Sequence, residues 1–361
     1  MRDTRALFRA DTNSPMDKEK DRIEALDFLR GIASLSVALF HFFNVVEPGL
    51  LRTISSYGNL GVQVFFVISG FIIPYSLFRG GYVLRNYGTF VLKRVIRLDP
   101  PYFVTIAIII ALGVFSWYVP FQQDQVFHVT LPQVLLHFAY INVFFGYPWL
   151  NDVFWTLAIE FQYYLLIGLA FPIIFSRDAR VRLASFALLG ALAFVIHPPA
   201  FIFYYIFLFY MGILTCQLRV RLIGRRQYAL LLVVSTVLAL LTTGWPSTLA
   251  AAFAVFVILC LRMRHAAFRF LGSISYSLYL VHSPIGRRAL NVVLRLTHAQ
   301  TMGARLFAIL VATIVSIIAA YVLYRLVERP AQAWSARLRY QHRRKPAEPR
   351  PEELEQLNPA F

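Results

Sequence analysis

Arg30 and His41 are the residues of this chain whose types and spacing first point to chemistry. They lie in one apolar run, and every residue between them is uncharged. Eleven steps along an α-helix return to within about 20° of the starting direction, roughly 16 Å further along the axis. Asp27, one turn before Arg30, falls near the same stripe. A guanidinium binds anions such as phosphate, and an imidazole exchanges protons near neutral pH. This stripe is therefore a candidate for both tasks.

Ionisable side chains inside a membrane helix cost at least about 2–3 kcal/mol each, so they usually face a polar cavity or a substrate path. We therefore expect Asp27, Arg30 and His41 to line one polar passage. The alternative is that Asp27 and Arg30 form a structural ion pair, with His41 as a hydrogen-bonded interior side chain.

The composition indicates a membrane protein. Of the 361 residues, 58% are hydrophobic and only 15% are charged. The apolar residues form blocks near the length that spans a bilayer. The predicted fold class is an all-α polytopic membrane protein with about ten transmembrane helices around a polar central cavity. The expected spans are 24–43, 59–78, 101–119, 153–175, 183–196, 200–218, 228–243, 247–261, 271–286 and 306–327.

The net charge of +17 reflects membrane topology. Most of the 35 Lys and Arg residues lie in alternate connecting segments, which include both chain ends. Cytoplasmic segments carry such an excess, so both termini are expected to be cytoplasmic. No basic patch is interleaved with aromatic residues in a soluble unit, and we expect no nucleic-acid partner. Arg287, Arg288, Arg295 and Arg305 break the pattern: either the ninth span is offset, or these arginines serve an anionic acceptor or lipid.

Three parts are expected along the chain. Residues 1–22 are predicted to be a disordered cytoplasmic leader, and 23–332 the membrane domain. Residues 333–361 are predicted to be a disordered basic tail, because their Arg, Pro, Glu and Gln bury too little apolar surface to fold alone. The chain's two cysteines lie far apart in apolar runs, so neither a disulfide framework nor a metal site is expected.

Polar side chains also interrupt the second span and precede the third. Gln63 and Ser69 lie in an otherwise apolar helix. Lys93, Arg94 and Arg97 lie within about one helical turn, immediately before a span that starts with proline. Such a basic cluster commonly anchors a helix at the inner surface, and it could also bind phosphates.

The fourth and ninth spans carry the remaining polar clusters. Glu160 lies about two turns into the fourth span, with Tyr163 beside it and Trp155 near the outer mouth. A buried carboxylate needs a partner or a proton. Trp155 suits either stacking on the ring of a ligand or an interfacial anchor. In the ninth span, the side chains that either line a cavity or bond neighbouring helices are Tyr276, Ser277, Tyr279 and His282.

Together these motifs resemble the acyltransferase-3 family of integral membrane proteins, which O-acylate glycans and other molecules. The resemblance covers about residues 22–332. Its motifs are the Arg30–His41 spacing, the run Phe65-Phe66-Val67-Ile68-Ser69-Gly70-Phe71, Arg94 with Arg97, Trp155 with Glu160, Ser275 to His282, and Glu328-Arg329-Pro330.

This resemblance implies a multi-pass protein of the bacterial cytoplasmic membrane, in contact with membrane lipid and without a permanently bound cofactor. The implied donor is cytoplasmic acyl-CoA, most commonly acetyl-CoA, acting as a co-substrate. The implied acceptor is a hydroxyl of a glycan, oligosaccharide or small molecule at the outer face.

The resemblance also assigns roles. The expected catalytic residues are His41, Arg30 and Glu160, with His41 as general base or, alternatively, as carrier of an acyl-histidine intermediate. Glu160 would orient His41 or bind sugar hydroxyls. Lys93, Arg94 and Arg97 would bind the donor. The expected acceptor or cavity-lining residues are Asp27, Gln63, Ser69, Trp155, Tyr163, Tyr276, Ser277, Tyr279 and His282.

A competing interpretation is a transporter or flippase with a protonatable pathway through Arg30, Glu160 and His41. Transporters often contain paired broken helices in two related halves. The sequence shows no such pairing, which favours the enzyme.

Overall fold

The computed structural model describes residues 24–116, 129–261, 265–298 and 301–340. Within these ranges every regular element is a helix, and seven helical stretches are long and apolar enough to cross a membrane. The chain is therefore an all-α polytopic membrane protein, as its composition predicts. The predicted leader lies outside the described residues.

The predicted spans fall largely on helices, so the apolar blocks located them well, while the number of ten membrane crossings stays a prediction. The longer helices are α2 (Glu24–Phe42), α4 (Gly61–Arg79), α5 (Tyr87–Ser116), α7 (Phe154–Ile174), α8 (Ala179–Val195), α9 (Ile206–Arg219), α10 (Arg225–Cys260), α11 (Ala266–Val281) and α13 (Met302–Leu323). The shorter ones are α3 (Leu50–Ser56), α6 (Leu131–Phe138), α12 (Arg287–Leu296) and α14 (Arg329–Arg337).

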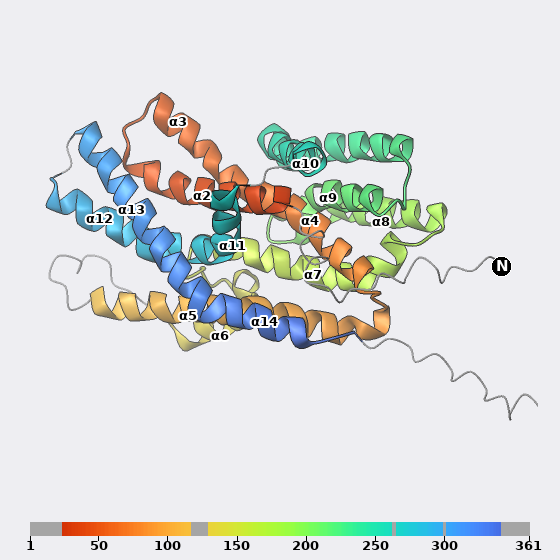
Figure 1. Ribbon diagram of the computed structural model, residues 1–361, viewed down its shortest axis with the longest axis horizontal. Coiled ribbons are helices and arrows are strands. Elements are labelled where there is room, and N and C mark those ends of the chain that lie inside the picture. The colour runs from red at the N-terminus through yellow and green to blue at the C-terminus, as the bar shows by residue number, and fades with distance from the viewer. Residues whose placement is uncertain (1–23, 117–128, 262–264, 299–300, 341–361) are drawn as a thin grey trace, which may run out of the picture.

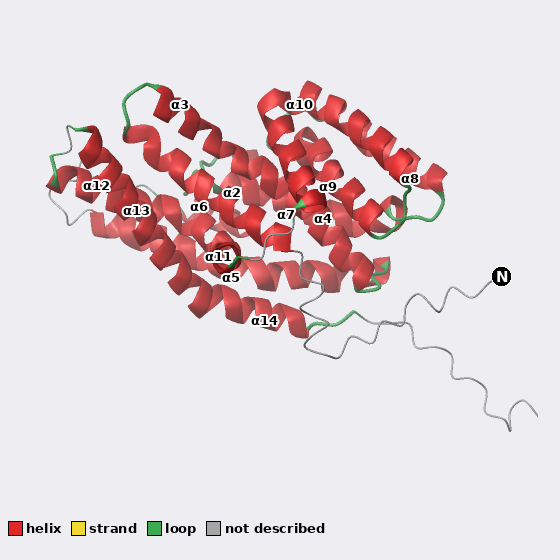
Figure 2. Cartoon of the chain, turned by 45° about the horizontal axis from the view of Figure 1, so that its top comes forward, coloured by secondary structure: helices red, strands yellow, loops and turns green. Residues whose placement is uncertain are grey.

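Helix α10 contains two predicted spans joined by a bend. Gly244, between them, has a φ of 79°, a left-handed backbone conformation that glycine adopts without a steric penalty. Pro246 follows and lacks the N–H that a continuous helix would use. Figure 2 shows the two arms of α10 diverging from this bend.

Helix α5 begins earlier than expected. The third span was predicted to start at residue 101, after a basic loop, but α5 starts at Tyr87 and continues through Pro100 and Pro101. The basic cluster is therefore helical. Membrane helices tolerate such prolines where neighbouring groups satisfy the freed carbonyls.

The predicted tail is partly packed onto this helix. Helix α14 runs beside α5 in both ribbon views (Figures 1 and 2), and the Ser335 hydroxyl donates to the Lys93 carbonyl over 2.7 Å. The Lys93 ammonium in turn donates to the Leu338 carbonyl. Residues 333–340 thus belong to the folded unit, and the rest of the predicted tail lies outside the described residues.

Helices α2 and α11 approach each other closely at the centre of the fold (Figure 1). Gly31 of α2 faces Leu271 and Gly272, and a methyl group at Gly272 would overlap the backbone of Asp27. Small residues allow such close helix contacts in membranes. This contact places the polar stripe of α2 beside the Ser- and Tyr-rich face of α11.

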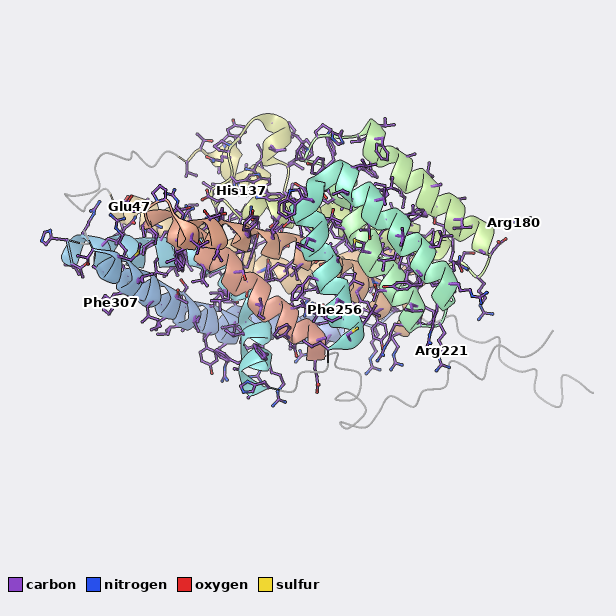
Figure 3. All side chains as sticks on the ribbon, turned by 90° about the horizontal axis from the view of Figure 1, so that it is seen from above. Glu47, His137, Arg180, Arg221, Phe256 and Phe307 are labelled. Carbon is purple, nitrogen blue, oxygen red and sulfur yellow. The ribbon has the colours of Figure 1, made fainter. Side chains whose placement is uncertain are left out.

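A connecting segment between α5 and α7 is anchored by polar contacts. The backbone N–H of Leu150 donates to Nε2 of His137, on α6, over 3.1 Å, and the Tyr140 hydroxyl donates to Asp99 of α5 over 2.9 Å. Burial lowers the pKa of His137, labelled in Figure 3, which suits a neutral ring that accepts this bond. His137 is therefore a structural residue of the segment.

Candidate active site

A cavity of about 540 Å³ lies among α2, α4, α5, α7 and α11 and the C-terminal end of the described chain. The predicted site residues that line it are Asp27, Arg30, Ser69, Arg94, Arg97, Glu160, Tyr276 and Tyr279. They come from five helices that are far apart in sequence. The predicted polar central cavity is therefore present, and much of the predicted polar set faces it.

Three guanidinium groups give the cavity its cationic character. Arg30 comes from α2, and Arg94 and Arg97 come from α5, one turn apart. Arg97 lies within electrostatic range of both other arginines. Arg94 is 7% exposed and lies over the rings of Phe90 and Tyr164, at 5.2 and 5.6 Å from their centroids. Such cation–π contacts hold a guanidinium without consuming its donors.

The Nε donor of Arg94 is buried and has no hydrogen-bond partner among the described residues. A buried unpaired donor costs free energy, about 1–3 kcal/mol and more for a charged group. An anionic ligand in the cavity would relieve this cost, because Arg pairs well with phosphate oxygens.

Glu160 is one of the acidic groups of the cavity. The Ser69 hydroxyl donates to its carboxylate over 2.7 Å, which joins α4 to α7. Tyr164, one turn further along α7, also hydrogen-bonds to this carboxylate. The carboxylate interacts electrostatically with Arg30 and Arg94. Glu160 is thus tied to the arginine cluster.

Glu328 also lines the cavity, as do Asp27 and Glu160, but the sequence did not single it out as a site residue. It ends a π-helical turn, η7 (Tyr324–Glu328), and accepts bonds from the Ser277 backbone at 3.2 Å, the Ser277 hydroxyl at 2.6 Å and the Gln332 amide at 2.9 Å. Ser277 therefore holds the Glu328 carboxylate in place by two hydrogen bonds, and it does not itself line the cavity. The sequence does show a carboxylate at the end of the last span. There it forms part of the motif Glu328-Arg329-Pro330, which carries the family resemblance but no predicted site role.

His41 lies outside this cavity, which corrects the expectation of one continuous passage. An Arg287 Nη donates to His41 Nδ1 over 2.8 Å, and the other Arg287 Nη pairs with Asp152 at 2.7 Å. The side chains of Arg287 and Asp152 are 38% and 55% exposed. The alternative in which Glu160 orients His41 does not fit this arrangement, since Arg287 hydrogen-bonds to His41 and Glu160 bonds to Ser69.

His282 packs beside His41, with ring centroids 5.2 Å apart. It is fully buried, against Phe42 and Tyr279, and begins the π-helical turn η6 (His282–Gly286). Tyr279 lines the cavity on one side. On its other side, the centroid of its ring lies 6.0 Å from the centroid of the His282 ring. Its hydroxyl is bonded to Thr156 at 2.7 Å. Tyr279 therefore forms part of the wall between the cavity and the two imidazoles.

Four more predicted residues do not line the cavity. Lys93 bonds to the Leu338 carbonyl, as described above. Tyr163 is 1% exposed and stacks on Phe209 at 4.2 Å, and Trp155 packs against Tyr205 at 5.9 Å. The Gln63 side-chain oxygen is buried, and no described residue donates a hydrogen bond to it. The sequence predicted these residues near the site from their positions along the helices. In the structure their side chains contact neighbouring helices or the protein interior and do not face the cavity.

The arginines that broke the charge pattern also have contacts in the fold. Arg287 bonds to His41 and Asp152, as described above. Arg288 donates to the Pro284 carbonyl over 2.7 Å, and Arg305 pairs with Glu47, labelled in Figure 3, at 2.6 Å. Arg287, Arg288 and Arg305 therefore stabilise local structure. Binding of an anionic acceptor or lipid by these arginines stays a prediction.

Comparison with known proteins agrees with this architecture. A viral protein named as an acetyltransferase, from Acidianus two-tailed virus, is 30% identical over 143 residues, covering 39% of this chain and 38% of the viral one. A protein of Bacillus subtilis (strain 168), named as a peptidoglycan O-acetyltransferase, is 27% identical over 178 residues, covering 45% and 26%. The matches thus span well under half the length of these relatives. No solved structure matches the chain.

The family comparison covers most of the membrane domain. The acyltransferase-3 family, described as an acyltransferase domain, matches residues 23–325. This range includes α2 with Arg30 and His41, the arginines of α5, Glu160, and both imidazoles of the pair. The chain belongs to the acyltransferase-3 family.

Proposed function

We propose that this protein is an integral membrane O-acyltransferase. It moves an acyl group, in our proposal acetyl, from cytoplasmic acyl-CoA to a hydroxyl of a glycan or related acceptor at the outer face of the bacterial cytoplasmic membrane. The observation that carries the proposal is the cavity of an acyltransferase-3 domain lined by three arginines from two helices. The alternative, a transporter, has no comparable support.

The cavity suits an acyl-CoA donor. CoA carries phosphate groups, and Arg30, Arg94 and Arg97 offer planar donors for phosphate oxygens. The volume of about 540 Å³ lies within the roughly 300–1,000 Å³ typical of small-molecule sites. In this proposal the arginines bind the donor, and the carboxylates of Glu160 and Glu328 hold the arginines in place.

His41 is the proposed general base. An alcohol attacks a thioester poorly unless its proton is removed as the new bond forms, and a positioned imidazole contributes about 10²–10⁴-fold to such a step. An acyl-histidine intermediate on His41 is the rival chemical role. In either case the acyl group passes the wall formed by Tyr279, so the catalytic state requires a shift of this side chain.

The acceptor is proposed to arrive at the side of His41 that carries Arg287 and Asp152, because these two side chains are exposed. A hydroxyl on a glycan is the proposed class. The peptidoglycan O-acetyltransferase name of the Bacillus subtilis relative supports a cell-surface glycan. Polar, exposed charged groups at this mouth suit a hydrated acceptor.

Radiolabelled acetyl-CoA tests this function. Membranes that contain the protein should release free CoA and transfer label to an acid-stable, base-labile ester in the glycan fraction, whereas matched membranes without it should not. Mass spectrometry of the glycan would show an added acetyl mass. If neither label nor mass appears with acyl donors of several chain lengths, the enzyme proposal fails and a transporter becomes the better account.

A further inference from the structure

His282 presents a buried nitrogen lone pair that no group of the described residues uses. Its Nδ1 lies 3.1 Å from the Leu278 carbonyl, and a carbonyl can only accept, so Nδ1 carries the proton. In a neutral imidazole the other nitrogen, Nε2, is then an unprotonated acceptor. This Nε2 is buried, in a residue that is 0% exposed, and has no hydrogen-bond partner in the part of the chain that the structure describes. An unsatisfied buried acceptor is costly and calls for an explanation.

His41 has the opposite tautomer. Its Nδ1 receives a bond from Arg287, and a guanidinium can only donate, so the Nδ1 lone pair is occupied and the proton of the neutral ring lies on Nε2. His41 alone therefore offers no free basic nitrogen in this arrangement. A hydroxyl reaches its lone pair only by replacing Arg287, which keeps Asp152 as its partner.

The two rings differ in access as well as in tautomer. Arg287, which donates to His41 Nδ1, and its partner Asp152 are partly exposed, whereas His282 is enclosed by Phe42, Tyr279 and His41 itself. The ring centroids are 5.2 Å apart with an interplanar angle of 35°. The rings are thus neighbours, and passage of a proton between them requires a rotation of the His41 ring that turns its Nε2 toward Nε2 of His282. Within the pair, Nδ1 of His41 therefore lies beside partly exposed side chains, and Nε2 of His282 is enclosed.

We propose that His41 and His282 form a two-imidazole proton relay, in which His282 is the positioning residue that receives the proton. This inference rests on the proposed acyl transfer. As the acceptor oxygen bonds to the acyl carbon, its proton passes to His41 Nδ1, and the Nε2 proton of His41 passes to Nε2 of His282. The C–S bond breaks, the electron pair leaves on sulfur, and the proton returns through the relay to the thiolate, giving CoA thiol.

Replacement of His282 by asparagine tests the relay. The shorter amide can still donate to the Leu278 carbonyl but has no basic nitrogen. We expect kcat to fall by about 10²-fold or more, with the donor KM within about twofold and an unchanged melting temperature in detergent. The control is His197→Asn, at an exposed histidine. Wild-type kcat in His282→Asn would overturn the relay, and so would a loss of activity that is fully accounted for by loss of folded protein.

Nitrogen-15 NMR of histidine-labelled protein reads the tautomers without any activity measurement. We expect His41 as the Nε2–H form and His282 as the Nδ1–H form, each assigned by loss of its signals in His41→Gln and His282→Asn. The reverse tautomer at either ring would overturn the relay. If the tautomers are as expected but the wild type transfers no acyl group, the proposed function fails while the imidazole arrangement stands.

Discussion

Replacing His41 with alanine should lower the rate of acyl transfer by about 10²–10⁴-fold, the contribution of a positioned general base. A hydroxyl can reach the His41 lone pair by replacing Arg287, whereas His282 is enclosed, so of the two imidazoles only His41 can take a proton directly from a hydroxyl. The donor KM should change little, because His41 does not line the arginine cavity. Initial rates with labelled acetyl-CoA at several donor concentrations would measure both quantities.

The matched control is His197→Ala, which removes an exposed imidazole outside the site. Both variants should insert in the membrane at wild-type levels, since His41 is only half-buried. A His41→Ala protein that retains wild-type kcat would remove His41 from both proposed roles, base and acyl carrier. A parallel loss in His197→Ala would instead indicate a general effect on the protein.

Replacing Arg97 with alanine should raise the donor KM by roughly 10–100-fold, with a smaller effect on kcat. A charge-assisted hydrogen bond contributes about 1.5–3 kcal/mol, which corresponds to this range. Arg97 lines the cavity and lies within electrostatic range of Arg30, Arg94 and Glu328, so its loss removes positive charge where phosphates are proposed to bind. Titration of acetyl-CoA in the transfer assay gives the KM.

Arg225→Ala is the control for this substitution. Arg225 is exposed at the start of α10. Its replacement by alanine also lowers the net charge by one, but it changes no residue that lines the cavity. It should leave the donor KM unchanged. An unchanged KM in Arg97→Ala, or an equal rise in both variants, would contradict the phosphate-binding role of the cavity arginines.

The fold was largely predictable from the sequence because the apolar blocks are long and the membrane leaves few alternatives. The blocks located the helices, and the pair of segments around Gly244 correctly marked a bend inside α10. The start of α5 was missed because two prolines and a basic cluster ordinarily indicate a loop before a helix. In this fold, α14 packs against the basic part of α5, so a tertiary contact overrides the local signal.

The site was only partly predictable. Helical spacing grouped Asp27 and Arg30, which both line the cavity. Polar residues in apolar spans led to Ser69 and Glu160, and the basic cluster before the third span led to Arg94. Spacing alone could not show that α2 carries His41 past the end of the cavity. Nor could it show the bond from Arg287, which is distant in sequence and is brought to His41 by the turn of η6. Such contacts depend on how helices pack, and no local pattern records that.

The central claim is that the donor enters from the cytoplasmic side and the acceptor from the other. Sealed membrane vesicles of defined orientation test it directly, with labelled acetyl-CoA added only outside. Inverted vesicles, which expose the cytoplasmic face, should transfer label to acceptor trapped inside, and right-side-out vesicles should do so only after they are made permeable. Equal transfer by intact vesicles of both orientations would contradict the account, because the donor would then reach the arginines from either side of the membrane.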